Sequence, residues 1–257
     1  MAALVVEARA SQDPNAAVKT RFTDLGRHLL NRLQKVAGDI AEKGRAMTHI
    51  VKPLSFEPTK LKGLSEKLIV SHWENNYGGA VRRLNAITAQ LAELDFAKAP
   101  IFAINGLKRE ELIATNSMIL HELYFESLGG DGISDGAAIE EGLKQNFGSV
   151  DRWRAEFVST GKALRGGAGW VLLTYSHRDQ RLMNQWAADH THALAGGTPI
   201  LALDMYEHSY QFDYGASAER YVDAFMENIN WSNVARLHQN QAPGERASEL
   251  EVWGANR

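Results

Sequence analysis

Asp204 and His208 are the two residues whose types and spacing most directly suggest chemistry. They stand four apart in the segment Asp204-Met205-Tyr206-Glu207-His208-Ser209-Tyr210, and residues four apart face the same way on a helical turn. A carboxylate and an imidazole on one side of a turn can share one metal ion. The same spacing also occurs in ordinary polar pairs, so further ligands are needed before it indicates a metal site.

Two more histidines, His72 and His121, lie inside stretches that we expect to be long amphipathic helices, residues 64–94 and 110–128. Apolar neighbours surround each of them, and burying an imidazole without a partner costs free energy. Either histidine alone fits a core histidine with an internal hydrogen bond. If the fold brings both to Asp204 and His208, the four side chains make a metal site.

The composition of the chain restricts which ligands and partners it can use. Because the 257 residues include no cysteine, disulfides, thiolate nucleophiles, cysteine-ligated zinc and cysteine-held iron–sulfur clusters are excluded. Any metal ion must be held by histidine and carboxylate. A net charge of -3 provides no basic field for nucleic acid, so any attraction of an anionic substrate must come from local lysine and arginine.

No apolar run approaches the ~20 residues that span a bilayer, and Glu7 and Arg9 interrupt the first ten residues. We therefore expect a soluble, cytoplasmic protein with no signal peptide and no membrane span.

The spacing of apolar residues predicts the elements that must position these side chains. Residues 64–94 and 110–128 are expected to form two antiparallel helices, and residues 137–164 a further helix. Three β-prone runs, the first two joined as a hairpin, and a last helix follow at residues 170–175, 181–187, 199–203 and 219–229.

An extra helix is predicted near the N-terminus, over about residues 13–43, where apolar residues recur three or four apart. Its apolar face would pack on the body of the protein, bind a partner or lie on a membrane surface. The predicted organisation is an N-terminal extension, a helical-hairpin domain, an α/β domain and a polar tail, at residues 1–46, 47–133, 134–240 and 241–257.

In this order, several segments resemble the iron/manganese superoxide dismutase family from about Met47 to His238. The Asp-x-Trp-Glu-His-x-Tyr signature of that family is present with Tyr206 in place of tryptophan. Other segments that resemble the family are His72 with Asn85, Leu120 to Phe125 around His121, Phe147-Gly148-Ser149, Gly166-Gly167-Ala168-Gly169-Trp170 and Asn230-Trp231. The resemblance implies an α+β fold, in which a helical hairpin precedes an α/β domain with a three-stranded antiparallel sheet.

The resemblance also implies a function and a metal. In that family three imidazoles, one carboxylate and a solvent molecule hold one iron or manganese ion, which converts superoxide to dioxygen and hydrogen peroxide. The implied ligands here are His72, His121, Asp204 and His208. Both ions accept this nitrogen and oxygen donor set, so the sequence does not choose between them.

Three further roles follow from the resemblance. His190 matches the residue that hydrogen-bonds the solvent at the metal if one residue is deleted before Pro199, whereas an ungapped alignment places Ala188 there. Glu207 matches a glutamate that crosses a dimer interface, and Gln211 stands where the family has an interface tyrosine. The resemblance therefore implies a homodimer or a dimer of dimers.

The chain departs from the family at the substrate entrance. Asn76 and Ala80 replace a histidine and a tyrosine there, and residues 72, 76 and 80 would share one face of a regular helix. We therefore expect a wider entrance without those two titratable groups, in which Asn76 and Gln211 form an amide pair. Two other functions stay open on this evidence: an oxidase or oxygenase-like enzyme that acts on an organic substrate, and a non-catalytic metal-binding or interaction protein.

Overall fold

The computed structural model describes residues 48–134 and 137–241. The chain divides into two units, Met1–Met47 and Thr48–Arg257, and the described residues all belong to the second. The predicted N-terminal helix over 13–43 and nearly all of the predicted polar tail lie outside the described residues, so both stay predictions.

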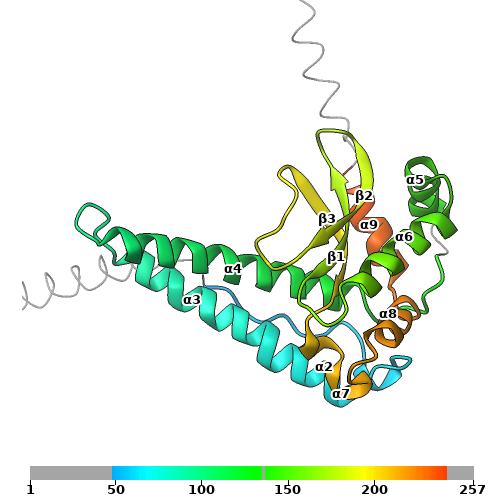
Figure 1. Cartoon of the computed structure of the whole chain (residues 1–257), viewed down its shortest axis with the longest axis horizontal. Coiled ribbons are helices and arrows are strands. Elements are labelled where there is room, and N and C mark those ends of the chain that lie inside the picture. Colours follow the sequence, from blue (N-terminus) through cyan, green and yellow to red (C-terminus); the bar gives the residue numbers. More distant parts are fainter. Residues whose placement is uncertain (1–47, 135–136, 242–257) are drawn as a thin grey trace, which may run out of the picture. The chain divides into compact units, whose positions relative to one another are not determined.

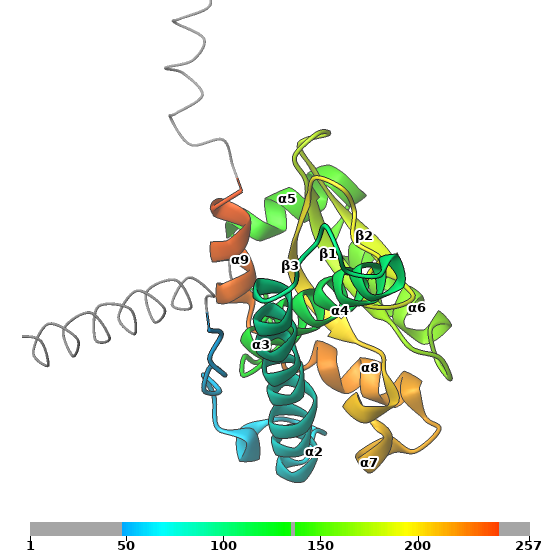
Figure 2. The same ribbon diagram turned by 90° about the vertical axis from the view of Figure 1, so that its left-hand side faces the viewer.

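The two stretches that carry His72 and His121 form a helical hairpin (Figures 1 and 2). Its first arm begins with helix α2 (Glu66–Ser71) and ends with helix α3 (Gly78–Ala92). Helix α4 (Ile101–Glu126) runs back along it as the second arm. Ser65 starts the first arm as an N-cap, because its side chain accepts a hydrogen bond from the Leu68 N–H.

A π-helix, η2 (His72–Tyr77), interrupts the first arm between α2 and α3. We expected one continuous α-helix over 64–94. The segment is helical, but the π-helix shifts the hydrogen-bond register between α2 and α3. A π-helix closes i to i+5 hydrogen bonds, so it holds more residues in each turn than an α-helix and commonly occurs at functional sites. It begins at His72, one of the four candidate ligands.

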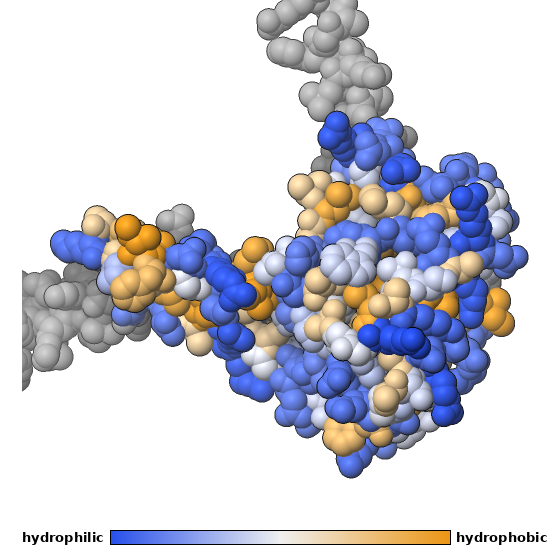
Figure 3. All heavy atoms as spheres, in the orientation of Figure 1, coloured by the Kyte–Doolittle hydropathy of each residue, from blue (hydrophilic) through white to orange (hydrophobic). Residues whose placement is uncertain are grey.

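Helix α4 begins at Ile101 after Pro100, well before the predicted start at Glu110. Ile101 and Phe102 are 85% and 80% exposed, so no buried stripe marks this part of the helix in the sequence. With Phe96 they form the apolar tip of the hairpin, which is visible on the molecular surface (Figure 3). No helix in the described part of the chain is both long enough and apolar enough to cross a membrane.

The predicted helix over 137–164 is two helices, α5 (Ala137–Phe147) and α6 (Val150–Ala163). Gly148 separates them with a φ of 87°, a conformation that favours glycine. Ser149 then caps α6, because its side chain accepts a hydrogen bond from the Arg152 N–H.

The predicted three-stranded antiparallel sheet is confirmed. It consists of β1 (Trp170–Ser176), β2 (Arg181–Ala187) and β3 (Gly197–Asp204), in the order β2-β1-β3. The central strand β1 is buried along its whole length, and its pairing places Trp170 opposite Asp204. Helix α4 packs against β3, while α5 and α6 pack against the other two strands (Figure 1).

Short helices complete the fold after the sheet. They are the 3-10 helix η3 (Glu207–Ser209) and helices α7 (Gln211–Tyr214), α8 (Ala218–Met226) and α9 (Trp231–Gln239). Helix α9, which the apolar spacing did not predict, begins at the Asn230 N-cap and buries Trp231 and Val234. The described chain thus has the predicted α+β fold.

Candidate metal centre

The fold brings the four predicted ligands together from both halves of the described chain. His72 opens the π-helix, His121 lies on α4, Asp204 ends β3 and His208 lies in η3. One candidate ligand atom from each residue lies within 4.8 Å of the other three. We call His72, His121, Asp204 and His208 the four-residue cluster.

Asp204 is the centre of the cluster. Its Oδ2 lies 3.2 Å from His72 Nε2, 3.2 Å from His208 Nε2 and 3.6 Å from His121 Nε2. Its Oδ1 accepts a hydrogen bond of 2.8 Å from the backbone N–H of Tyr206. This bond fixes the carboxylate so that one oxygen faces the three imidazoles.

Asp204 and His208 meet by a different route from the predicted helical turn. Asp204 is the last residue of a strand, and His208 follows in a 3-10 turn. The backbone carbonyl of Asp204 accepts hydrogen bonds from Tyr221 Oη at 2.8 Å and Ser209 Oγ at 2.9 Å. The Ser209 bond folds the turn back onto the strand end, and this explains why residues four apart still converge.

His121 is held in one tautomer by its own helix. Its Nδ1 lies 2.6 Å from the backbone carbonyl oxygen of Ser117, so Nδ1 carries the proton and donates it. The lone pair of Nε2 therefore faces the cluster. Ser117 was not among the predicted site residues, although a backbone acceptor for a buried histidine on a helix lies one turn before it.

Burial keeps the imidazoles of His72 and His121 neutral. It lowers the pKa of His121 to about 3, and it also lowers the pKa of His72, an effect that the neighbouring Asp204 carboxylate opposes. Burial alone would raise the pKa of Asp204, but the adjacent His208 and His72 bring it below its ordinary value. At neutral pH His72 and His121 therefore present neutral imidazoles and Asp204 a carboxylate, the forms that bind metal.

The cluster fits a metal ion. Both ring nitrogens of His72 and Nε2 of His121 are buried without a hydrogen-bond partner, a costly arrangement for a polar atom. With metal–ligand bonds of about 2.0–2.2 Å, donors on opposite sides of one ion lie about 4.4 Å apart, close to the 4.8 Å span of the cluster. Three nitrogens and one oxygen suit iron or manganese.

His190 lies beside the cluster. Its ring centroid is 6.0 Å from that of His121 and 4.9 Å from that of Tyr206, on which it stacks at 15°. Trp170 Nε1, which can only donate, lies 3.0 Å from His190 Nδ1. The neutral His190 ring therefore carries its proton on Nε2, as a donor.

A hollow of about 550 Å³ opens outside the cluster. Asn76 and Gln211 both line it, as the predicted amide pair requires, and the other lining residues are Ser71, Glu207, His208 and Phe212. Ala80 does not line it: this residue is 7% exposed and belongs to the apolar core. The π-helix lies between His72 and Ala80, so residues 72, 76 and 80 do not follow one regular helix, and the wider entrance at Ala80 stays a prediction.

A buried cluster of three histidines and one carboxylate, assembled by a helical hairpin and a three-stranded sheet, defines a protein with a site for one metal ion. Residues 135–237 match the family described as iron/manganese superoxide dismutases, C-terminal domain. The chain is 70% identical over 189 residues to the protein named superoxide dismutase [Fe] of Cupriavidus metallidurans, covering 74% of this chain and 95% of that relative. The chain therefore belongs to the iron/manganese superoxide dismutase family.

More distant relatives carry both metals in their names. Superoxide dismutase [Fe] of Aquifex pyrophilus is 34% identical over 70% of this chain and 86% of its own length. Superoxide dismutase [Mn] 2 of Haloferax volcanii is 32% identical over 75% of this chain and 96% of its own length.

Proposed function

We propose that this protein is a superoxide dismutase that holds one iron ion through His72, His121, Asp204 and His208. The observation that carries the proposal is the convergence of these four side chains, in which buried nitrogens of His72 and His121 have no partner. Membership of the family supports the reaction. Iron is favoured over manganese because the relative with 70% identity is named for iron.

When bound, the ion supplies the one-electron chemistry by which one superoxide is oxidised to dioxygen and a second, with two protons, is reduced to hydrogen peroxide. The residues of the chain contribute orientation and charge. Asp204 brings one negative charge to the centre, and the Tyr206 N–H holds it in place. Ser117 fixes the tautomer of His121. The apolar core excludes bulk water from the inner side of the site.

His190 holds a proton at Nε2 beside the centre, because Trp170 donates to its other nitrogen. We assign it the hydrogen bond to a solvent molecule held there. On the outer side, the amides of Asn76 and Gln211 line the hollow. Neither amide has a titratable proton, so the titratable side chains that line this hollow are Glu207 and His208.

The experiment that tests the function compares three forms of the purified protein: metal-free, iron-loaded and manganese-loaded. We expect superoxide removal in a direct kinetic assay only from the loaded forms, with the iron form the faster. If neither loaded form removes superoxide faster than the free ion at the same concentration, the proposed function is wrong. Faster turnover with manganese would overturn the choice of iron alone.

We further propose a homodimer in which Glu207 and Gln211 lie at the contact. Both side chains are exposed, next to His208 at the mouth of the hollow. In the family resemblance, the glutamate at position 207 reaches the last ligand histidine of the partner. Such a contact would place a charged hydrogen bond at the interface, and losing it is costly.

Glu207→Ala should therefore weaken the dimer by about tenfold or more in Kd. Sedimentation equilibrium over a concentration series measures the change. Glu141→Ala, at an exposed glutamate on α5, is the matched control and should leave the dimer unchanged. A dimer equally stable in the Glu207→Ala protein would remove Glu207 from the interface.

A further inference from the structure

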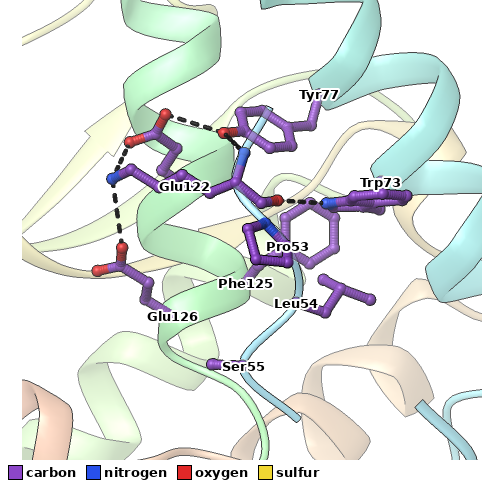
Figure 4. A pocket seen from close by; sticks show the side chains of 9 residues that line it. Pro53, Leu54, Ser55, Trp73, Tyr77, Glu122, Phe125 and Glu126 are labelled. Atoms are coloured by element: carbon purple, nitrogen blue, oxygen red, sulfur yellow. Dashed lines mark hydrogen bonds and ion pairs between the residues drawn. The ribbon is translucent and has the colours of Figure 1, made fainter. Parts of the chain in front are cut away.

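Lys52 contacts both histidine-bearing arms of the hairpin. It lines a pocket together with Trp73, Tyr77 and Glu122, which Figure 4 shows. Its backbone and its side chain contact different arms. The backbone contacts the π-helix, and the ammonium group contacts α4. This small pocket of about 90 Å³ lies between these contacts.

The backbone contacts span the π-helix. The backbone carbonyl of Lys52 accepts a hydrogen bond of 2.9 Å from Trp73 Nε1, and its N–H donates one of 2.9 Å to Tyr77 Oη. Trp73 and Tyr77 are four residues apart, close to one turn of a π-helix. One peptide segment therefore ties together both ends of the wide turn that begins at His72.

The side-chain contacts attach the same residue to α4. Lys52 Nζ lies 2.5 Å from Glu122 Oε2 and 3.5 Å from Glu126 Oε1. Tyr77 Oη closes the ring of contacts, because it donates to Glu122 Oε1 at 2.9 Å. Burial raises the pKa of Tyr77 to about 12, so the phenol stays a donor. Its side chain is 1% exposed.

These contacts are adjacent to the cluster along the chain. Trp73 follows His72, and Glu122 follows His121. Phe125, one helical turn after His121, lies with its ring centroid 5.1 Å from His72 and 6.1 Å from Tyr77. If the wide turn relaxed to an α-helix, the loss of one residue from the turn would rotate His72 by about 100° relative to α3.

We propose that Lys52 is a positioning residue of the metal centre: it clamps the π-helix to α4 and thereby sets how His72 and His121 face one another. The inference rests on the proposed metal site. It assigns Lys52, Tyr77 and Glu122 a role in positioning the ligands, although none of the three is itself a ligand.

The test measures the metal rather than turnover. Lys52→Met removes both ion pairs, and Tyr77→Phe removes the two hydrogen bonds of the phenol. In the iron-loaded full-length protein, each should shift the visible absorption of the ion. Each should also speed iron loss to a chelator by about tenfold, the lower range for outer contacts of a metal site. Lys52→Arg should restore both properties.

Lys60→Met is the control, because Lys60 is an exposed lysine paired only with Glu57 among the ion pairs of the described chain. It should leave the spectrum and the rate of iron loss unchanged. The inference is overturned if Lys52→Met and Tyr77→Phe lose thermal stability but keep the spectrum and the iron-loss rate of the original protein. If Lys52→Met does not fold, Tyr77→Phe alone decides. Failure of the original protein to bind iron at this site would instead overturn the proposed function.

Discussion

Replacing His121 by alanine should reduce the bound metal from about one ion per chain to less than about a tenth of that, and should abolish dismutation. Nε2 of His121 is a buried nitrogen without a hydrogen-bond partner, and its lone pair is available to the metal. The Ser117 carbonyl fixes this tautomer of the ring. Without His121, three donors remain around an enlarged gap. An incomplete donor set binds a multivalent ion poorly.

Elemental analysis of protein loaded under identical conditions measures this effect, and circular dichroism shows whether the variant is folded. His208→Ala should give the same result. His177→Ala is the matched control: His177 is exposed and contacts Thr198 at the other end of the sheet, so it should keep its metal. Full occupancy in folded His121→Ala protein would show that the ion is bound elsewhere.

The four ligands were predicted together through the resemblance to the family, whereas the residue pattern alone could place only His121, which lies on a regular helix. His121 lies on an uninterrupted helix, and a burial pattern read from sequence places it inward. The strands were predictable for a similar reason, since β1 is an apolar run with turn residues after it. Local patterns that extend over a whole element are not easily overridden by packing.

The π-helix could not be predicted in this way. Its hydrogen bonds differ from those of an α-helix by one residue, and the contacts of Trp73 and Tyr77 that accompany it are with Lys52, more than twenty residues earlier in the chain. Apolar spacing contains no information about such partners. The prediction that Ala80 lies at the entrance assumed a regular helix through this segment.

Two other predicted helix boundaries were wrong, because the features that set them leave no periodic pattern in the sequence. The start of α4 carries exposed apolar residues rather than a buried stripe. The break between α5 and α6 depends on a single glycine with positive φ and the serine cap after it. Phe147-Gly148-Ser149 resembles a family segment, and in the structure it forms the end of one helix and the cap of the next.

Replacing His190 is expected to have the second large effect. The experiment tests whether a residue that is not a ligand controls the turnover and the reduction potential of the metal. The ring lies beside His121, stacks on Tyr206 and accepts a hydrogen bond from Trp170. His190→Ala removes a proton donor at Nε2 and leaves the Trp170 N–H without its acceptor. Because His190 is not one of the four ligands, the variant should still bind about one ion per chain.

The expected result is a loss of about 100-fold in turnover, in the range for positioned proton donors, together with a shifted reduction potential of the ion. Rapid mixing of superoxide with oxidised and with reduced protein measures each half-reaction. The peroxide-forming half should lose more, because it alone consumes protons. His190→Gln, whose amide can still donate, should recover part of the rate.

The alternative alignment, which places Ala188 at this position, makes the opposite prediction. It treats His190 as a loop residue whose removal changes neither the ion nor the reaction. If His190→Ala protein keeps the spectrum, the potential and both rates, the placement of His190 at the solvent is wrong. The donor that serves the centre must then be sought among the other side chains that line the hollow, which include the amides of Asn76 and Gln211.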